Sequence, residues 1–113
     1  MDLGKHYIAL AVKDVGSSKA FYEKLGFVHA PGFGSIEDKW LMMINGENKI
    51  GLYQDMFPKN TLTFNPLDVR SIQKHLKKSG VEIKIQADES ATGPAYIMLI
   101  DPDGNPILLD QYE

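Results

Sequence analysis

The sequence contains no cysteine, which excludes disulfide bonds, thiolate metal ligands and a cysteine nucleophile. It also has no basic block, and its formal net charge is only −3, so nucleic acid is not expected as its main partner. No apolar run reaches the roughly 20 residues that a membrane-spanning helix needs. The amino terminus lacks the charged and apolar regions of a signal peptide. We therefore expect a cytoplasmic protein with neither nucleic-acid nor membrane partners.

The 113 residues suffice for one domain, or for two half-domains that share a core. Part of the chain is repeated, because residues 12–27 match residues 66–81 after a shift of 54 positions. The identical pairs are Asp14/Asp68, Val15/Val69, Ser17/Ser71, Lys24/Lys78 and Gly26/Gly80. We interpret this as a duplication within a single domain over 1–113, with one module at about 4–54 and the other at about 60–112.

Alternating apolar residues predict the strands of both modules. They are expected at 5–12, 27–31, 39–44 and 48–54, and again at 61–65, 81–86, 95–100 and 105–111. Asn45-Gly46 predicts a tight hairpin turn. The run from Asp101 to Gly104 suits a type I turn.

One helix is predicted in each module, over about 18–25 and about 68–79. Ser17 is of the type that caps a helix amino terminus, and a glycine follows the end of each helix. In the first helix Phe21 and Leu25 have the spacing of an apolar face. Each module therefore has the order βαβββ.

Residues 14–27 and 101–109 resemble sequences of the vicinal oxygen chelate superfamily. This superfamily contains glyoxalase I, extradiol dioxygenases, fosfomycin-resistance enzymes and bleomycin-resistance proteins. The resemblance covers essentially the whole chain and is specific to the fold rather than to one activity. It implies an α+β protein with two tandem βαβββ modules, whose curved mixed sheet forms a cup with the helices on its outer face. It also implies a homodimer.

The metal enzymes of that superfamily place ligands on the first and fourth strands of each module. By resemblance, the first-strand position is Tyr7, and the fourth-strand position is Gly51, or Tyr53 if the register slips by two. In the second module the positions are Thr61 and Leu108. None of these side chains is a usual divalent-metal ligand. We therefore expect no metal cofactor, and a divalent ion only if the metal site has diverged.

The three histidines are far apart in the sequence. His6 is adjacent to a ligand position but has the opposite strand parity, so it is expected to be half-exposed outside the cup, unless the alignment is shifted by one residue. His75 is expected to be a solvated helix residue. Whether His29 lines the cup is left open.

Strand parity also predicts which side chains line the cup. For residues 39–44 and 95–100 the parity is ambiguous, and Trp40, Met42 and Tyr96 are taken as candidates there. The candidate ligand-binding residues are Tyr7, Trp40, Met42, Tyr53, Thr61, Thr63, Tyr96, Leu108 and Asp110. This mixture of aromatic, apolar and hydroxyl side chains suits an apolar or planar ligand with a few polar contacts. The alternative is that the aromatic rings simply fill the interior.

Three functions remain open. The first is a metal-independent protein that binds a small molecule and resembles the bleomycin-resistance branch. The second is a glyoxalase- or dioxygenase-type enzyme with a divergent metal site, acting as a lyase or an oxidoreductase. The third is an interaction domain with a filled cup. As an inward carboxylate Asp110 could bind a cationic group or act as a general base, and the alternative is that it is solvated at the rim of the cup.

Overall fold

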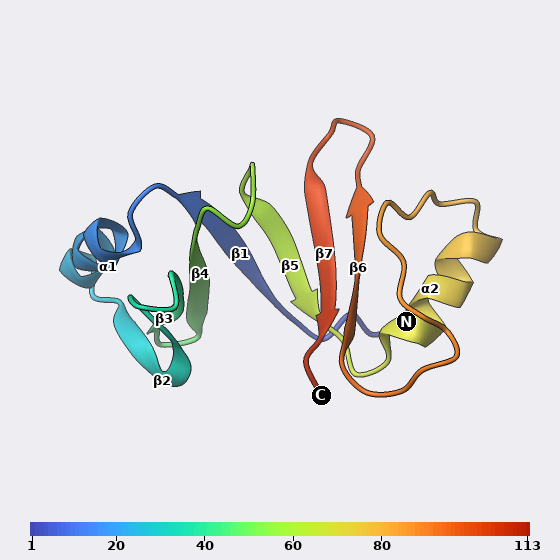
Figure 1. Cartoon of the computed structure of the whole chain (residues 1–113), viewed down its shortest axis with the longest axis horizontal. Helices are drawn as coiled ribbons and strands as arrows, with labels where there is room; N and C mark the ends of the chain where they lie inside the picture. Colours follow the sequence, from blue (N-terminus) through green and yellow to red (C-terminus); the bar gives the residue numbers. More distant parts are fainter. The chain divides into compact units, whose positions relative to one another are not determined.

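The computed structural model describes residues 1–113, which form two helices and seven strands (Figure 1). Neither helix has the length and apolar character needed to span a membrane. In chain order the elements are β1 (Lys5–Val12), α1 (Val15–Lys24), β2 (Val28–Ser35), β3 (Trp40–Asn45), β4 (Asn48–Gln54), β5 (Thr61–Asn65), α2 (Val69–Lys78), β6 (Ala95–Ile100) and β7 (Pro106–Gln111).

Contacts divide the chain into two units. The first unit is Tyr7–Thr61, and the second unit is Met1–His6 together with Leu62–Glu113. In the first unit the strand order is β2-β3-β4-β1, with β1 parallel to β4 and the other pairs antiparallel. In the second unit it is β5-β7-β6, with β5 parallel to β7. The prediction of an α+β fold with mixed strand pairing is confirmed.

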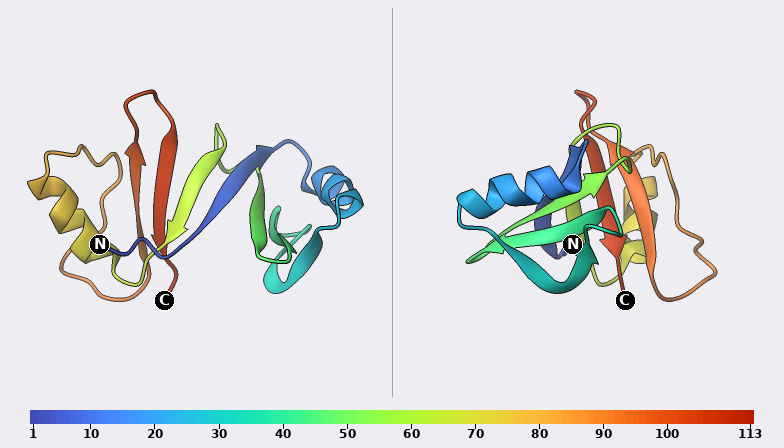
Figure 2. Two further views of the ribbon diagram at one scale, coloured as in Figure 1. Left: turned by 180° about the vertical axis from the view of Figure 1, so that it is seen from behind. Right: turned by 60° about the vertical axis from the view of Figure 1, so that its left-hand side comes forward.

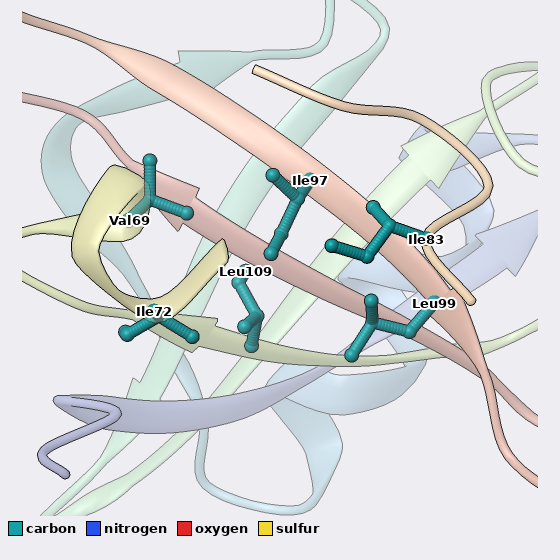
Figure 3. Packing of buried hydrophobic residues seen from close by; sticks show 6 residues of the cluster. All are labelled: Val69, Ile72, Ile83, Ile97, Leu99 and Leu109. Carbon is teal, nitrogen blue, oxygen red and sulfur yellow. The ribbon is translucent and has the colours of Figure 1, made fainter. Parts of the chain in front are cut away.

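In each unit the helix packs against one face of the strands. In the first unit α1 contacts β3 and β4, and the buried residues between them are Val15, Leu41, Met43 and Leu52. In the second unit α2 contacts β6 and β7, as two views show (Figure 2). Its core gathers Val69, Ile72, Ile83, Ile97, Leu99 and Leu109 (Figure 3). Full burial of one such side chain contributes about 1.5–3 kcal/mol.

The first helix begins three residues earlier than predicted. Asp14, not Ser17, is its N-cap, and the Asp14 carboxylate accepts hydrogen bonds from the backbone N–H groups of Gly16 and Ser17. Both residue types cap helices well, so the sequence alone did not decide between them. The predicted apolar face is also wrong, because Phe21 and Leu25 are 57% and 58% exposed.

Both helices end in the same way. In α1 the N–H of Gly26 donates to the carbonyl of Glu23, and the N–H of Phe27 donates to the carbonyl of Tyr22. Gly80 and the residue after it repeat these bonds at the end of α2. This pattern is the Schellman motif, and the φ angles of +92° at Gly26 and +77° at Gly80 explain why glycine stands there. The predicted helix ends are confirmed.

A second repeated feature attaches each helix to its sheet. Gln54, at the end of β4, accepts a hydrogen bond at Oε1 from the N–H of Val15, over 2.9 Å. Gln111, at the end of β7, accepts the equivalent bond from the N–H of Val69, over 3.0 Å. Both valines are buried. A buried N–H group without a hydrogen-bond partner destabilises the folded state. The first N–H groups of a helix have no acceptor within the helix, and each glutamine supplies one.

Truncating either glutamine should therefore destabilise the protein. We expect Gln54→Ala and Gln111→Ala each to lower the free energy of unfolding by about 1–2 kcal/mol, because each leaves one N–H group unpaired. Urea denaturation measures this difference. Ser17→Ala is the control, since Ser17 is exposed and is not the cap, and it should change stability by less than about 0.5 kcal/mol. A loss as large for Ser17→Ala would contradict the assignment of Asp14 as the cap.

The predicted strand at 81–86 is absent. Only one bridge forms there, between Ile85 and Met98, although the alternation of Val81, Ile83 and Ile85 suggested a full strand. The residue that follows this segment, Ala87, is bound by the side chain of Gln73 on α2, which is 0% exposed. Its Nε2 donates to the Ala87 carbonyl, and its Oε1 accepts from the Ala87 N–H. The second unit therefore has three strands where four were predicted.

The remaining strand predictions differ little from the structure. The bounds 48–54 and 61–65 agree with β4 and β5. The second strand continues to Ser35, beyond the predicted end at 31, with an irregular register between His29 and Gly34. A turn forms at Asp101 as predicted, and it is closed by a hydrogen bond from the Gly104 N–H to the Asp101 carbonyl.

Candidate ligand-binding site

The sheet of the first unit has one face covered by α1 and one face without a helix. The pairing register of the strands places several of the candidate ligand-binding residues on the face without a helix. Gly51 lies opposite Ala9 on β1 and opposite Met42 on β3. Tyr53, two residues further on β4, lies opposite Trp40. Because directly paired residues point to the same side of a sheet, these side chains share one face, which resolves the parity that the sequence left open for residues 39–44.

Four aromatic side chains form a layer on this face, and we call Tyr7, Trp40, Tyr53 and Phe57 the aromatic layer. The rings of Trp40 and Tyr53 are stacked, with centroids 5.9 Å apart and an angle of 6° between their planes. Phe57 meets Tyr53 edge-on, with centroids 5.1 Å apart. Such pairs each contribute about 0.5–1.5 kcal/mol beyond the area they bury. The central ring, Tyr53, is thus fixed on two sides.

The layer also contains a polar pair. The hydroxyl groups of Tyr7 and Tyr53 are 3.2 Å apart and hydrogen-bonded, and the Tyr53 hydroxyl also donates to Sδ of Met42, at 3.7 Å. Tyr7 and Met42 are buried, whereas Trp40 and Tyr53 are half-buried. The arrangement combines flat apolar surface with two oxygen atoms that can donate or accept hydrogen bonds.

Gly51 makes the layer possible. A Cβ atom at this position would lie 2.6 Å from a ring carbon of Tyr53, 3.1 Å from a ring carbon of Tyr7 and 3.2 Å from Sδ of Met42. These distances are shorter than ordinary van der Waals contacts, so only a residue without a side chain lets the two phenol rings lie against β4.

Sequence analysis did not identify Lys49 and Phe57 as neighbours of this site. Nζ of Lys49 lies 5.1 Å from the centroid of the Tyr7 ring and 5.7 Å from that of Phe33, within cation–π range. Lys49 has the strand parity of Gly51 and Tyr53, and this signal could have found it. Phe57 follows the last strand of the module, where parity gives no information.

Four other predicted residues lie on one sheet face of the second unit. Thr63 is paired with Leu108, and Asp110 is paired with Tyr96. Thr63 is buried, Leu108 is half-buried and Tyr96 is exposed. The ninth residue, Thr61, belongs to the first unit, where its hydroxyl donates to the Lys59 carbonyl.

Asp110 and Tyr96 also line an open hollow of about 650 Å³ in the second unit. Partial burial raises the pKa of the Asp110 carboxyl above its ordinary value, because the surroundings disfavour the charged form. The pKa of Asp101 is lowered instead, chiefly by hydrogen bonds from Asn105, which identifies that carboxylate as a structural part of its turn.

The residues at the superfamily's metal positions do not fit a divalent ion. Tyr7, Gly51, Thr61 and Leu108 offer no imidazole or carboxylate, and no three His, Cys, Asp or Glu side chains come together as a metal-binding group. His6 is exposed and packs against Phe64, with ring centroids 5.1 Å apart.

The other two histidines are also dispersed. His29 is half-buried, and its Nε2 is hydrogen-bonded to the Phe33 carbonyl, at 3.1 Å. His75 is exposed on α2, as predicted.

Comparison with known proteins establishes the family. A sequence model of the Glyoxalase/Bleomycin resistance protein/Dioxygenase superfamily matches residues 4–109. Because this match covers nearly the whole chain, the protein belongs to that superfamily. A comparison with curated proteins gives no match.

Solved structures of low sequence identity share the fold. One is a Legionella pneumophila protein described as an NAD-dependent benzaldehyde dehydrogenase, with 19% identity, a TM-score of 0.74, and coverage of 96% of this chain and 100% of that one. A superfamily member from Vibrio splendidus 12B01 has 13% identity and a TM-score of 0.71, covering 95% and 97%. Methylmalonyl-CoA epimerase from Mycobacterium tuberculosis has 14% identity and a TM-score of 0.72, covering 95% and 86%. At these identities the likeness concerns the fold alone.

Proposed function

We propose that this protein binds a small aromatic or apolar molecule on the aromatic layer, without a metal ion. The observation that carries the proposal is the stacked pair of Trp40 and Tyr53, held over Gly51 beside two hydrogen-bonded phenol groups. A planar ligand would stack on the exposed parts of these rings, and the hydroxyl groups of Tyr7 and Tyr53 would provide its polar contacts.

The contrast between the two sheet faces supports a binding role over simple core filling. The face under α1 is filled by aliphatic and methionine side chains such as Leu41, Met43 and Leu52. The opposite face carries large amphipathic rings, and Trp40 and Tyr53 keep part of their surface accessible. Rings fixed by stacking lose little conformational entropy when a ligand binds, which favours affinity.

A thermal-shift titration with a fused-ring compound such as 2-naphthol tests this proposal. Ligand at 100-fold its Kd should add about 2.7 kcal/mol to the free energy of unfolding. Trp40→Ala should abolish this shift because it removes the stacking surface, and Tyr53→Phe should weaken binding about 5- to 10-fold because it removes one hydroxyl contact. Phe21→Ala is the control, since Phe21 is an exposed aromatic residue on α1. An unchanged shift in Trp40→Ala would refute the assignment of the layer as the site.

Metal analysis of the purified protein tests the metal-independent part of the proposal. We expect no nickel, zinc, iron or manganese in stoichiometric amount, and the 2-naphthol shift should persist after treatment with a chelator. Near one ion per chain, with loss of binding on chelation, would favour a metal-dependent enzyme of the glyoxalase or dioxygenase type instead.

A further inference from the structure

We propose that the second unit holds a separate binding site for an organic ammonium ion, with Asp110 as its counter-ion. The site is the hollow formed by the start of β6, the end of β7 and the connection between α2 and β6. Its volume of about 650 Å³ is within the range of small-molecule sites. None of the residues that line this hollow belongs to the aromatic layer, and the proposal does not depend on the function proposed above.

Of the charged groups around the hollow, the carboxylate of Asp110 has no protein group that pairs with it. The charged residues that line it are Arg70, Asp88 and Asp110. Arg70 is already engaged, since its Nε and Nη1 donate to the carbonyls of Asp88 and Gly93, both at 2.8 Å. Its positive charge also lowers the pKa of Asp88, after the larger effect of the hydrogen bonds from Ser90.

The Asp110 carboxylate has no ion pair and accepts no hydrogen bond from the protein. Its backbone carbonyl accepts a hydrogen bond from Nδ2 of Asn65, at 2.9 Å, but this bond leaves the carboxylate uncompensated. Partial burial removes water from this carboxylate and raises its pKa. A ligand cation would relieve that unfavourable burial, because it would supply the missing opposite charge.

Two phenol rings stand near this carboxylate. Tyr96 lies directly opposite Asp110 in the strand pairing, and Tyr112 follows it by two residues. They are 49% and 62% exposed, and both line the hollow with the apolar side chains of Ile85 and Pro94. A hollow lined by both a carboxylate residue and tyrosines favours an ammonium group, and its apolar residues favour a ring or short alkyl body attached to that group.

Phenethylamine is a suitable probe, and 2-phenylethanol is its neutral counterpart. In isothermal titration at pH 7.5 the amine should bind at least about 10-fold more tightly than the alcohol, because only the amine pairs with Asp110. Asp110→Asn should remove this preference. Tyr96→Ala should weaken amine binding without creating a preference for the alcohol. Asp103→Asn, in an exposed turn, and Trp40→Ala, in the aromatic layer, should leave amine binding unchanged.

The pH dependence supplies a second readout. The pKa of Asp110 is higher in the folded protein than in the unfolded chain. Ionising this carboxyl group therefore lowers the free energy of unfolding, and this loss sets in as the pH rises toward the folded-state pKa. Asp110→Asn should therefore be folded and at least as stable as the natural protein at neutral pH, with the difference disappearing in acid. Amine binding by the natural protein should fall as the pH drops through the same pKa.

Three results would overturn the proposal. They are equal binding of the amine and the alcohol, an unchanged amine affinity in a folded Asp110→Asn protein, and no amine binding at tens of millimolar. Loss of amine binding in Trp40→Ala alone would assign the amine to the aromatic layer and would equally refute a site at Asp110.

Discussion

Replacing Gly51 by alanine is expected to lower the free energy of unfolding by about 2 kcal/mol and to abolish the thermal shift caused by 2-naphthol. The new Cβ atom would lie 2.6 Å from a ring carbon of Tyr53. That ring cannot simply turn away, because Trp40 stacks on it and Phe57 meets it edge-on. The aromatic layer would have to rearrange as a whole, and the surface proposed to receive the ligand would change.

Gly16→Ala provides the matched control for this experiment. Gly16 and Gly51 are the two glycines whose φ angles lie outside the left-handed region, so backbone strain does not complicate either substitution. A Cβ at Gly16 would meet only the Asp14 carboxylate, at 3.3 Å, and Ile36, at 4.0 Å. We expect a change below about 0.5 kcal/mol. If Gly51→Ala loses stability but keeps the full ligand shift, the ligand binds elsewhere.

Gln73→Ala is expected to destabilise the protein by about 3 kcal/mol. The amide of Gln73 is completely buried and makes two hydrogen bonds to the backbone of Ala87 and a third, at 2.8 Å, to the carboxylate of Glu89. Its loss would leave the N–H and the carbonyl of Ala87 without their partner and open a cavity beside α2. Thermal denaturation should show a midpoint roughly 10 °C lower.

Gln86→Ala is the comparison for this prediction, because Gln86 is exposed and lies one residue from Ala87. It should unfold within a degree or two of the natural protein. Amide hydrogen exchange gives a more local test, because Gln73→Ala should increase exchange at Ala87 more than at Ile97, which lies in the core of β6. Unchanged protection at Ala87 would mean that this segment does not depend on the buried amide.

Most elements of the fold could be predicted from local sequence signals. The bounds of β4 and β5 follow from alternation and from the Asn45-Gly46 turn, and both helix ends follow from glycine. The segment at 81–86 could not be predicted, because its alternation is that of a strand. The residue after it, Ala87, is bound by Gln73, a polar residue on a helix, and such a contact depends on tertiary structure.

Parity was similarly informative for the candidate site, but only within strands. It placed Tyr7 and Tyr53 on one face but was ambiguous for residues 39–44, and only the register shows Trp40 and Met42 on the face of Tyr53. Parity did not indicate that Gly51 makes room for two phenol rings. The approach of these rings to the Gly51 backbone depends on how the side chains pack, which periodicity does not describe. Phe57 lies beyond the strand, where periodicity ends.

The glutamines at the ends of β4 and β7 have a consequence for sequence change. Each helix is attached by an aspartate and a glutamine from its own unit, Asp14 with Gln54 and Asp68 with Gln111. Neither attachment uses a group from the other unit. Substitutions among the aromatic rings of one unit or at the carboxylate of the other can therefore accumulate without loosening either helix.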